Sequence, residues 1–541
     1  MYYADFIARI FKSAKVKYHM FENESTWFKT LMQKGEEDFH ARYEDAVLRV
    51  KEELGKTYPI IIDGKRINAD GVFPVLSPID IRIVVAHFQS GKNEHALSAI
   101  GAAKNAFKHW SRTDYKERIK IFRKAADIMS NKKYELSAML TFENGKNRYE
   151  SVADVDEAID FLRYYSEQME VNNGFVKPTK SAYPDEKGRS VMKPYGVWAV
   201  IAPFNFPMAL TDGMCAGAII TGNTVVLKPA SDTPLTAYKF CEILEEAGLP
   251  NGVINFVTGS GGVVGKALIE SDDVDGIVFT GSREVGLSIY RQANAKRPKP
   301  VITEMGGKNP ALVTKNADLD KAVDGVMRAA FSYSGQKCSA CSRVYVHESL
   351  RNEFVDRLVK RTKELVVGNP LNKDTYMGPV INESAYEKYK KHIEVARKDG
   401  KILLGGNVVT DGELKRGYYV QPTIVDKLPK EHMMFKEELF VPILTVADYK
   451  DFNEAIKLCN GVDYGLTAGI FSNDQNEISE FLDKIEAGVV YVNRARSATT
   501  GAMVGCQPFV GWKYSGISGK GTGSEYYLML FMREQSQTVC T

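Results

Sequence analysis

The residues of this chain that could carry out chemistry gather around Cys338, in the segment SGQKCSACSR (334–343). Small and polar residues flank Cys338, whereas a structural cysteine more often lies among aliphatic residues, as Cys241 does in KFCEIL. Such surroundings favour a nucleophilic thiol, which needs a second group to process the acyl group that it captures. Cys338 is therefore the candidate nucleophile.

Cys338 and Cys341 also form a C-x-x-C pair, so a zinc site and a redox dithiol are alternatives. Zinc needs about four ligands, and the sequence offers no second Cys/His pair at a suitable spacing. A thioredoxin-like dithiol belongs beside a βαβ unit near the start of a domain, whereas this pair lies deep in a long chain. The sequence thus predicts no metal site and a single reactive thiol.

Two further polar side chains follow apolar segments. Glu304, in ITEMGGKNP (302–310), precedes two glycines that let the backbone approach a ligand, and it is the candidate partner of the thiol. Asn205, in PFNFP (203–207), is the third candidate. An ordinary charge at a helix start and a plain turn residue are the alternatives, which the residues by themselves leave open.

Strand and helix patterns alternate between residues 196 and 307, with apolar segments at 196–203, 224–230, 252–259, 275–281 and 299–307. Strands that are apolar throughout are buried on both faces, which is typical of a parallel sheet covered by helices. A doubly wound nucleotide-binding fold is therefore predicted. Gly281 and Ser282 lie between a strand and a helix, where backbone N–H groups can hold a pyrophosphate. The glycine run GSGGVVG (259–265) lacks the G-x-G-x-x-G spacing.

The remaining segments complete the predicted architecture. Residues 1–55 have helical periodicity that ends at Gly55, and residues 59–68 predict a hairpin that turns at Asp63-Gly64. A second alternation of strands and helices, from residue 310 to about residue 493, predicts a second α/β domain. The polar segment 180–190 predicts a projecting two-stranded ribbon. Because such a ribbon is unstable alone, we expect a homo-oligomer, a dimer or larger.

Composition excludes several classes of protein. The 541 residues carry 71 Lys and Arg against 68 Asp and Glu, a formal charge of +3, so nucleic acid is not an expected partner. The most apolar stretch, 196–211, is too short and too rich in proline to span a membrane. The first twenty residues lack the apolar core of a secretory signal, and seven irregularly spaced cysteines favour a reducing compartment. A cytoplasmic protein is expected.

Seven ordered motifs resemble the aldehyde dehydrogenase superfamily from about residue 58 to 535: PFNFP, LKPAS, FTGS, EMGGKNP, GQKCSA, EELF and QPFVGWKYSG. Within it, GQKCSACSR, TTGAMVGCQPF (499–509) and VDEAIDF (155–161) are similar to the subfamily of Δ1-pyrroline-5-carboxylate (L-glutamate γ-semialdehyde) dehydrogenases. The resemblance implies NAD-dependent oxidation of L-glutamate γ-semialdehyde to L-glutamate, the second step of proline degradation. Another semialdehyde or an aliphatic aldehyde is the alternative substrate.

The resemblance also implies a three-part α/β architecture. A doubly wound, Rossmann-type NAD-binding domain would comprise residues 1–170 and 193–302, including the N-terminal helical segment 1–55. An α/β catalytic domain would comprise residues 303–515. A β-ribbon oligomerisation element would comprise residues 171–192 and 516–541.

The resemblance implies that the Cys338 thiolate attacks the aldehyde and that the Asn205 amide and the Cys338 backbone N–H stabilise the oxyanion. It also implies that Glu304 activates the water that hydrolyses the thioester. The implied cofactor-binding residues are Lys228, Ser231, Gly281, Ser282, Glu438 and Phe440. The implied substrate-binding residues are Ser339, Gly501, Ala502, Glu157, Phe206 and Phe509. A solvated helix charge is the alternative for Glu157, and core packing is the alternative for the two phenylalanines.

Three positions depart from the family's usual pattern. Many NAD-specific relatives have a glutamate where this chain has the small, neutral Ser231, so NAD is expected and NADP is the alternative. Val441 and Val510 stand where glycine is usual, and their β-branched side chains predict ordinary rather than positive φ angles. A relative that keeps the fold without activity, as some lens crystallins do, is disfavoured by the intact set Cys338, Glu304 and Asn205.

The C-x-x-C alternative makes a distinct prediction from that of a single nucleophile. A dithiol enzyme would lose activity in Cys341→Ser, whereas we expect that variant to stay active and Cys338→Ala to lose acyl transfer, because only Cys338 forms the covalent adduct. Aldehyde-dependent reduction of NAD, followed at steady state for both variants, measures the difference. Loss of activity in Cys341→Ser with intact folding would contradict the assignment.

Overall fold

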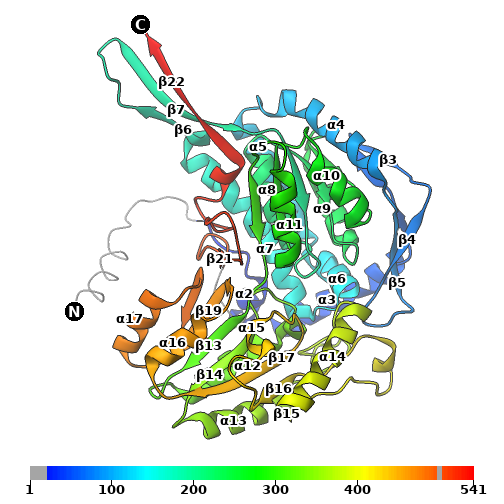
Figure 1. Ribbon diagram of the computed structural model, residues 1–541. Helices are drawn as coiled ribbons and strands as arrows, with labels where there is room; N and C mark the ends of the chain where they lie inside the picture. Colours follow the sequence, from blue (N-terminus) through cyan, green and yellow to red (C-terminus); the bar gives the residue numbers. More distant parts are fainter. Residues whose placement is uncertain (1–20, 34, 496–502) are drawn as a thin grey trace.

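The computed structural model of the protein describes residues 21–33, 35–495 and 503–541. Two seven-stranded sheets, each flanked by helices, make up the body of the molecule, and a narrow ribbon of three strands projects from it (Figure 1). Among the described residues, no helix combines the length and the hydropathy that crossing a lipid bilayer requires.

The first sheet has the order β12-β11-β8-β9-β10-β2-β3. Its five parallel strands are β8 (Val197–Ile201), β9 (Thr224–Lys228), β10 (Ile254–Phe256), β11 (Gly276–Thr280) and β12 (Val301–Glu304). Alternate residues of β8 enter two different hydrophobic clusters, Trp198 and Val200 in one, Val197 and Ala199 in the other. Burial on both faces confirms the predicted doubly wound sheet. The covering helices include α4 (Asn93–Trp110), α8 (Ala209–Ile220), α9 (Pro234–Ala247), α10 (Lys266–Glu270) and α11 (Arg283–Ala293).

An antiparallel hairpin extends one edge of this sheet. It consists of β2 (Ile60–Ile62) and β3 (Lys65–Ile67), and its turn residues Asp63 and Gly64 have φ angles of 53° and 70°. Two consecutive positive φ angles are the signature of a type I′ turn, so the predicted Asp-Gly hairpin is confirmed. A small separate sheet contains β1 (Thr57–Tyr58), β4 (Val72–Leu76) and β5 (Val84–Gln89).

The second sheet confirms the predicted second α/β region. Its order is β15-β16-β17-β14-β13-β19-β20, parallel except for β15. The strands are β13 (Asn309–Val313), β14 (Cys341–His347), β15 (Lys401–Leu404), β16 (Thr423–Asp426), β17 (Ile443–Tyr449), β19 (Thr467–Phe471) and β20 (Val489–Val492). The larger helices of this half are α12 (Leu319–Phe331), α13 (Arg351–Lys363), α14 (Glu383–Asp399), α16 (Phe452–Asn460) and α17 (Gln475–Lys484).

The projecting ribbon has three strands, which corrects the expected two. The predicted hairpin is β6 (Val176–Thr179) and β7 (Glu186–Pro194), and the C-terminal strand β22 (Met532–Cys540) pairs with β7 from Met532↔Pro194 to Cys540↔Glu186. The third strand satisfies the second edge of β7 with an antiparallel ladder along its full length. Figure 1 shows the ribbon standing clear of the body, with the C-terminus at its tip.

A further layer of helices supplies one wall of the candidate site. It contains α2 (Thr26–Met32), α3 (Glu36–Glu53), α5 (Tyr115–Asn131), α6 (Lys133–Asn144) and α7 (Arg148–Val171). Of these, α5, α6 and α7 pack against α8 and α9. α2 packs on α7 and α3 packs on α6. The chain leaves α3 just before Gly55, whose φ of 78° is readily adopted only by glycine.

Candidate active site

Two of the predicted catalytic residues lie at the edge of the first sheet where its parallel strands end. Glu304 is the last residue of β12, and Asn205 lies four residues beyond the end of β8. β11 lies between these two strands and leads into Gly281 and Ser282. Parallel strands end at the same edge, and ligands of doubly wound folds bind where the strand order reverses, here between β8 and β11.

Cys338 reaches this edge from the second sheet, just before β14. Its carbonyl oxygen accepts a hydrogen bond of 2.7 Å from Asn309 Nδ2. A Cβ atom on Gly307 would lie 2.6 Å from the same carbonyl oxygen, so the Cys338 backbone rests directly on the chain that follows Glu304. The glycine pair is therefore what allows the thiol and the carboxylate to share one site.

Burial is the largest influence on the pKa values of the Cys338 thiol and the Glu304 carboxyl. It raises the pKa of the Cys338 thiol above its usual range, and the carboxylates of Glu438, Glu304 and Glu157 raise it further, while the Ser339 N–H lowers it. Burial also raises the pKa of Glu304 well above its usual range, and the Gly511 N–H offsets this only in part. Neither Glu304 oxygen has a hydrogen-bond partner of normal geometry among the described residues.

Glu438 lies along the same glycine pair. Its Oε1 accepts a 2.9 Å hydrogen bond from the Gly307 N–H, and a Cβ on Gly306 would lie 2.0 Å from its Oε2. Burial raises the pKa of this carboxyl to about 7, although the Gly307 N–H, Lys388 and Lys308 lower it. Phe440, two residues on, has a φ of 57° and packs edge-on against Phe204, 5.8 Å between ring centroids.

The other predicted cofactor residues follow strand ends of the first sheet. Lys228 ends β9, and among the described residues its buried Nζ donates only to the Pro229 carbonyl, at 3.1 Å; burial lowers its pKa to about 8. Ser231 is exposed. Ser282 is the N-cap of α11 and accepts from the Val285 N–H at 3.4 Å, and Gly281 has no room for a Cβ beside the Phe279 ring.

The predicted backbone at the two valines is confirmed. Neither Val441 nor Val510 has a positive φ angle, and the positive value in this region belongs to Phe440. The C-x-x-C pair forms no disulfide: Cys338 is half-buried, and Cys341 is a buried free thiol on β14. Among the described residues, no three or more His, Cys, Asp or Glu side chains form a group that could hold a metal ion.

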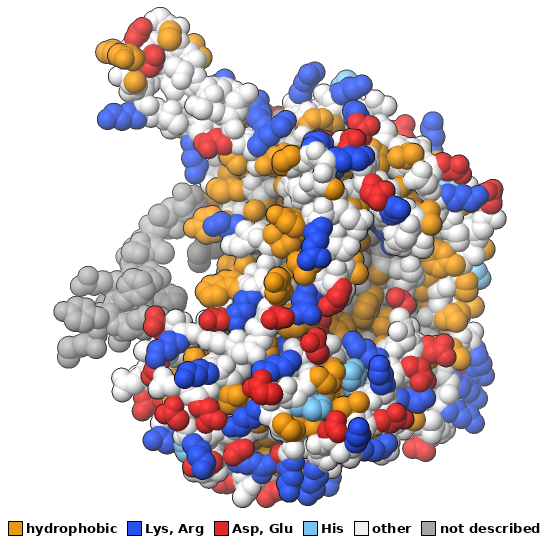
Figure 2. Space-filling model, in the orientation of Figure 1, with side chains coloured by type: hydrophobic (Ala, Val, Ile, Leu, Met, Phe, Trp, Pro, Cys, Tyr) orange, Lys and Arg blue, Asp and Glu red, His pale blue; other side chains and the backbone are white. Residues whose placement is uncertain are grey.

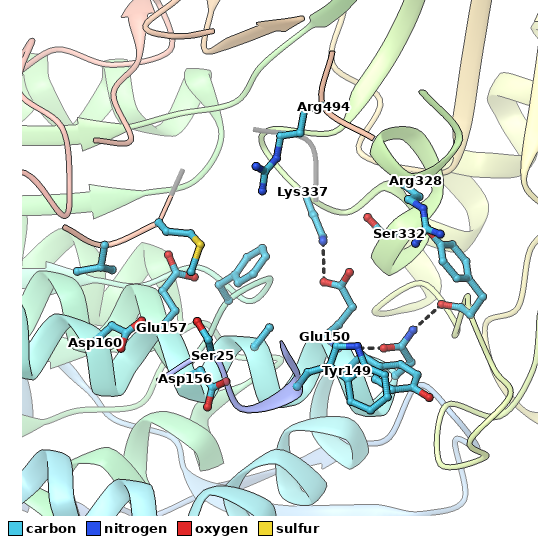
Figure 3. Close-up of a pocket in the computed structure, with 17 residues that line it drawn as sticks. Ser25, Tyr149, Glu150, Asp156, Glu157, Asp160, Arg328, Ser332, Lys337 and Arg494 are labelled. Atoms are coloured by element: carbon cyan, nitrogen blue, oxygen red, sulfur yellow. Dashed lines mark hydrogen bonds and ion pairs between the residues drawn. The ribbon is translucent and has the colours of Figure 1, made fainter. Parts of the chain in front are cut away.

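A cavity of about 530 Å³ opens beside this site (Figure 3). α7 supplies the acidic wall, with Glu150, Asp156, Glu157 and Asp160, and Phe206 continues it. The opposite side contains Arg328, Ser332, Tyr376, Lys337, which precedes Cys338, and Arg494. The remaining lining residues are Ser25, Trp27, Asn147, Tyr149, Ala153, Met503 and Val504.

Of the predicted substrate residues that the structure describes, Glu157 and Phe206 line this cavity, whereas Ser339 and Phe509 do not. Glu157 faces the cavity, and burial together with Asp154 and Asp160 raises its pKa to about 8. It is therefore not the solvated helix charge considered above. Phe509 is not among the lining residues, whereas Met503 and Val504 of the same segment are. Gly501 and Ala502 lie outside the described residues.

Sequence reasoning missed several groups that line this cavity or contact its lining residues. The Lys337 Nζ forms a 2.6 Å ion pair with Glu150, and the Lys146 Nζ lies 3.6 Å from the centroid of the Phe206 ring. A cation directly before a candidate nucleophile was a usable signal for Lys337. Ser25 and Trp27 had no local signal, because their place in the cavity comes from contacts far along the chain.

Comparison with known proteins agrees with this geometry. The model of the aldehyde dehydrogenase family matches residues 67–536, so the chain belongs to the aldehyde dehydrogenase family. The 1-pyrroline-5-carboxylate dehydrogenase of Geobacillus sp. (strain WCH70) is 41% identical over 503 residues, 92% of this chain and 95% of that protein. The resemblance seen in the motifs is thereby confirmed.

Solved structures extend the likeness to the fold. The crystal structure of a 1-pyrroline-5-carboxylate dehydrogenase from Thermus with bound NAD matches with a TM-score of 0.91 at 36% identity, covering 97% of this chain and 100% of that chain. A betaine aldehyde dehydrogenase from Staphylococcus aureus in complex with NAD+ matches with a TM-score of 0.86 at 30% identity, covering 92% and 97%.

The raised pKa of Cys338 predicts how its reactivity depends on pH. Only the thiolate is alkylated, so below its pKa we expect the rate of modification by iodoacetamide to rise about ten-fold per pH unit, without a plateau up to about pH 9. Mass spectrometry of the Cys338 peptide measures this rate. Glu304→Gln removes one of the carboxylates that raise the pKa and should speed modification at fixed pH. A plateau below about pH 8 would mean that the site stabilises the thiolate instead.

Proposed function

We propose that this chain oxidises L-glutamate γ-semialdehyde, which forms from Δ1-pyrroline-5-carboxylate by ring opening with water, to L-glutamate with NAD, as the second step of proline degradation. The observation that carries the proposal is a set of buried or half-buried polar side chains without protein partners. The Asn205 amide, the Ser339 hydroxyl and the Glu157 carboxylate form no hydrogen bond or ion pair with the described residues. Buried polar groups are normally paired, so such groups are poised for a ligand.

The charges match the substrate at both ends. Glutamate semialdehyde carries an aldehyde at one end and an α-carboxylate and an α-ammonium at the other. The proposal assigns the carboxylate to the Ser339 hydroxyl and to the backbone N–H groups of Gly501 and Ala502. It assigns the ammonium to Glu157 and the aliphatic stem to Phe206 and Phe509. The neighbouring relatives named 1-pyrroline-5-carboxylate dehydrogenase support this choice of substrate.

The residues present fit NAD at the edge of the first sheet. The α11 N-terminus offers backbone N–H groups beside the exposed Ser282, where a pyrophosphate binds favourably. Lys228 has no acidic partner in the described part of the chain, and Glu438 is fixed along Gly306 and Gly307, next to Glu304. In the proposal, Lys228 and Ser231 bind the adenosine ribose, Gly281 and Ser282 the pyrophosphate, and Glu438 and Phe440 the nicotinamide half. NADP stays the alternative at Ser231.

The side chains then act in sequence in the proposed mechanism. The Cys338 thiolate attacks the aldehyde carbon, while the Asn205 amide and the Cys338 N–H donate to the oxyanion. NAD held by Glu438 and Phe440 would supply the hydride acceptor for this tetrahedral adduct. Glu304 then takes a proton from the water that attacks the resulting thioester, and glutamate and the free thiol result. A raised pKa makes the ionised Glu304 a stronger base.

The same proposal divides the chain into three functional parts. Residues 1–170 and 193–302 would form the NAD-binding domain, 303–515 the catalytic domain, and 171–192 with 516–541 the oligomerisation element.

Figure 2 shows apolar side chains exposed on the body below the ribbon, and the exposed large apolar residues include Trp512, Tyr514 and Tyr526. Surface of this kind favours a homo-oligomer through the ribbon, and light scattering at micromolar concentration is expected to give at least a dimer.

A substrate panel tests the proposed activity. We expect kcat/KM for glutamate semialdehyde to exceed that for succinic semialdehyde, which lacks the α-ammonium, and NAD to be preferred to NADP. Steady-state reduction of each cofactor measures both. A preference for succinic semialdehyde would replace the proposed substrate with the alternative semialdehyde.

Ser339→Ala tests how the far end of the substrate is held. Loss of one donor to a buried carboxylate costs roughly 1.5–3 kcal/mol, so we expect about a ten- to hundred-fold loss in kcat/KM for glutamate semialdehyde. A short aliphatic aldehyde has no carboxylate, and its turnover should be nearly unchanged. Equal losses on both substrates would show that Ser339 supports Cys338 rather than binding the substrate.

A further inference from the structure

The segment 21–27, which we call the N-terminal strap, lies outside the part of the chain that the family model matches, yet it lines the cavity through Ser25 and Trp27. In Figure 3, Ser25 lies on the cavity floor beside Asp156 and near Glu157. We propose that the strap holds the substrate side of the cavity in shape and that Asn23 is a positioning residue for the segment 503–506. This inference deepens the proposed function and rests on it for the identity of the substrate.

The strap satisfies two buried carboxylates of α7. The Thr26 N–H and hydroxyl donate to Asp156 at 2.6 and 2.8 Å, and the Glu24 N–H donates to Asp160 Oδ1 at 2.8 Å. Burial raises the pKa of Asp156 to about 6 and that of Asp160 to about 7, and the strap donors lower both. These two aspartates flank Glu157 on the same helix, so the strap fixes the helix that carries the proposed ammonium ligand.

Glu24 links the strap to three neighbouring helices. Its carboxylate accepts a 2.8 Å hydrogen bond from Ser130 Oγ and forms ion pairs with Lys133 and Arg163. Lys133 also donates to Thr26 Oγ1 at 2.9 Å. These contacts tie the strap to α5, α6 and α7, and they hold the pKa of Glu24 down at about 2 against the effect of burial.

Asn23 connects α7 to the segment that follows the undescribed residues 496–502. Its Nδ2 donates to Asp160 Oδ2 at 2.8 Å and to the Val504 carbonyl at 3.0 Å, and the Cys506 thiol donates to its Oδ1 at 3.1 Å. One side chain thus bridges a buried carboxylate and two residues of segment 503–506, on which Met503 and Val504 line the cavity.

Aromatic packing reinforces this connection. Phe21 lies edge-on to Tyr164 of α7, 5.4 Å between ring centroids. A Cβ on Gly505 would lie 2.9 Å from both rings, so the backbone of Gly505 rests against this pair. Asn23 is therefore the polar part of a contact that seats Val504, Gly505 and Cys506 against α7.

Loss of the Asn23 amide should affect binding rather than chemistry. Asp160 and the Val504 carbonyl would each lose a donor, and the wall formed by Met503 and Val504 would loosen relative to Glu157. None of the contacts of Asn23 involves Cys338, Glu304 or Asn205. A substrate that fills the cavity should bind more weakly, whereas a short aldehyde should react as before.

Asn23→Ala and the matched variant Thr26→Val test this inference. Thr26→Val also removes one side-chain donor to a buried aspartate of α7, but Thr26 forms no hydrogen bond with segment 503–506. We expect Asn23→Ala to raise KM for glutamate semialdehyde about ten-fold, with kcat within about two-fold and propanal turnover unchanged. Thr26→Val keeps the backbone N–H that donates to Asp156, so its KM should stay within about two-fold of the unmodified enzyme. Equal effects on both aldehydes, or an equal rise of KM in Thr26→Val, would overturn the role given to Asn23.

A measurement without substrate separates this inference from the proposed function. Hydrogen exchange of the peptide that contains residues 503–507 should become faster in Asn23→Ala and not in Thr26→Val, whatever aldehyde the enzyme prefers. Unchanged exchange in Asn23→Ala would overturn the inference even if the substrate panel supports glutamate semialdehyde. Asn23→Ser, which cannot span both acceptors, should behave like the alanine variant and serves if the latter does not fold.

Discussion

The close approach of two backbones at Gly306 and Gly307 is the constraint on which the candidate site depends. The glycine pair follows Glu304 out of the first sheet, and a side chain on either residue would collide with a group from the second half of the chain. At Gly306 that group is the Glu438 carboxylate, and at Gly307 it is the Cys338 carbonyl. The thiol, the proposed base and the proposed ribose ligand therefore meet because glycine leaves the necessary space.

A second constraint is electrostatic and lies on α7. Asp154, Asp156, Glu157 and Asp160 occupy fewer than two turns of this helix, and like charges this close resist ionisation. Three of the four are paired with groups outside α7: Asp154 with Lys146 and the Ala209 N–H, and Asp156 and Asp160 with the N-terminal strap. Glu157 alone has no such partner among the described residues, and it faces the cavity.

The sequence predicts the features that depend on local patterns. Apolar strands implied a sheet buried on both faces, and the ends of those strands indicated where Asn205, Gly281 and Glu304 would emerge. The Asp63-Gly64 turn can be predicted from the sequence because a type I′ turn favours those residue types. Local pattern could not predict the third strand of the ribbon, because β22 pairs with β7 more than 300 residues away and its polar residues carry no strand signal of their own; only the family resemblance placed residues 516–541 in the same element.

The acidic run of α7 shows why the rest of the cavity escaped prediction. VDEAIDF has the spacing of an ordinary solvated helix face, and nothing in the segment shows that its aspartates are buried. Their burial is tolerable only because donors arrive from residues more than 130 positions away, as Asn23 and Glu24 do for Asp160. Charge patterns along a helix therefore identify candidate binding residues, while the partners of each charge indicate its function. The carboxylates that accept hydrogen bonds from the rest of the fold hold the helix in place, and the one that has no partner among the described residues is available to a cationic group of the substrate.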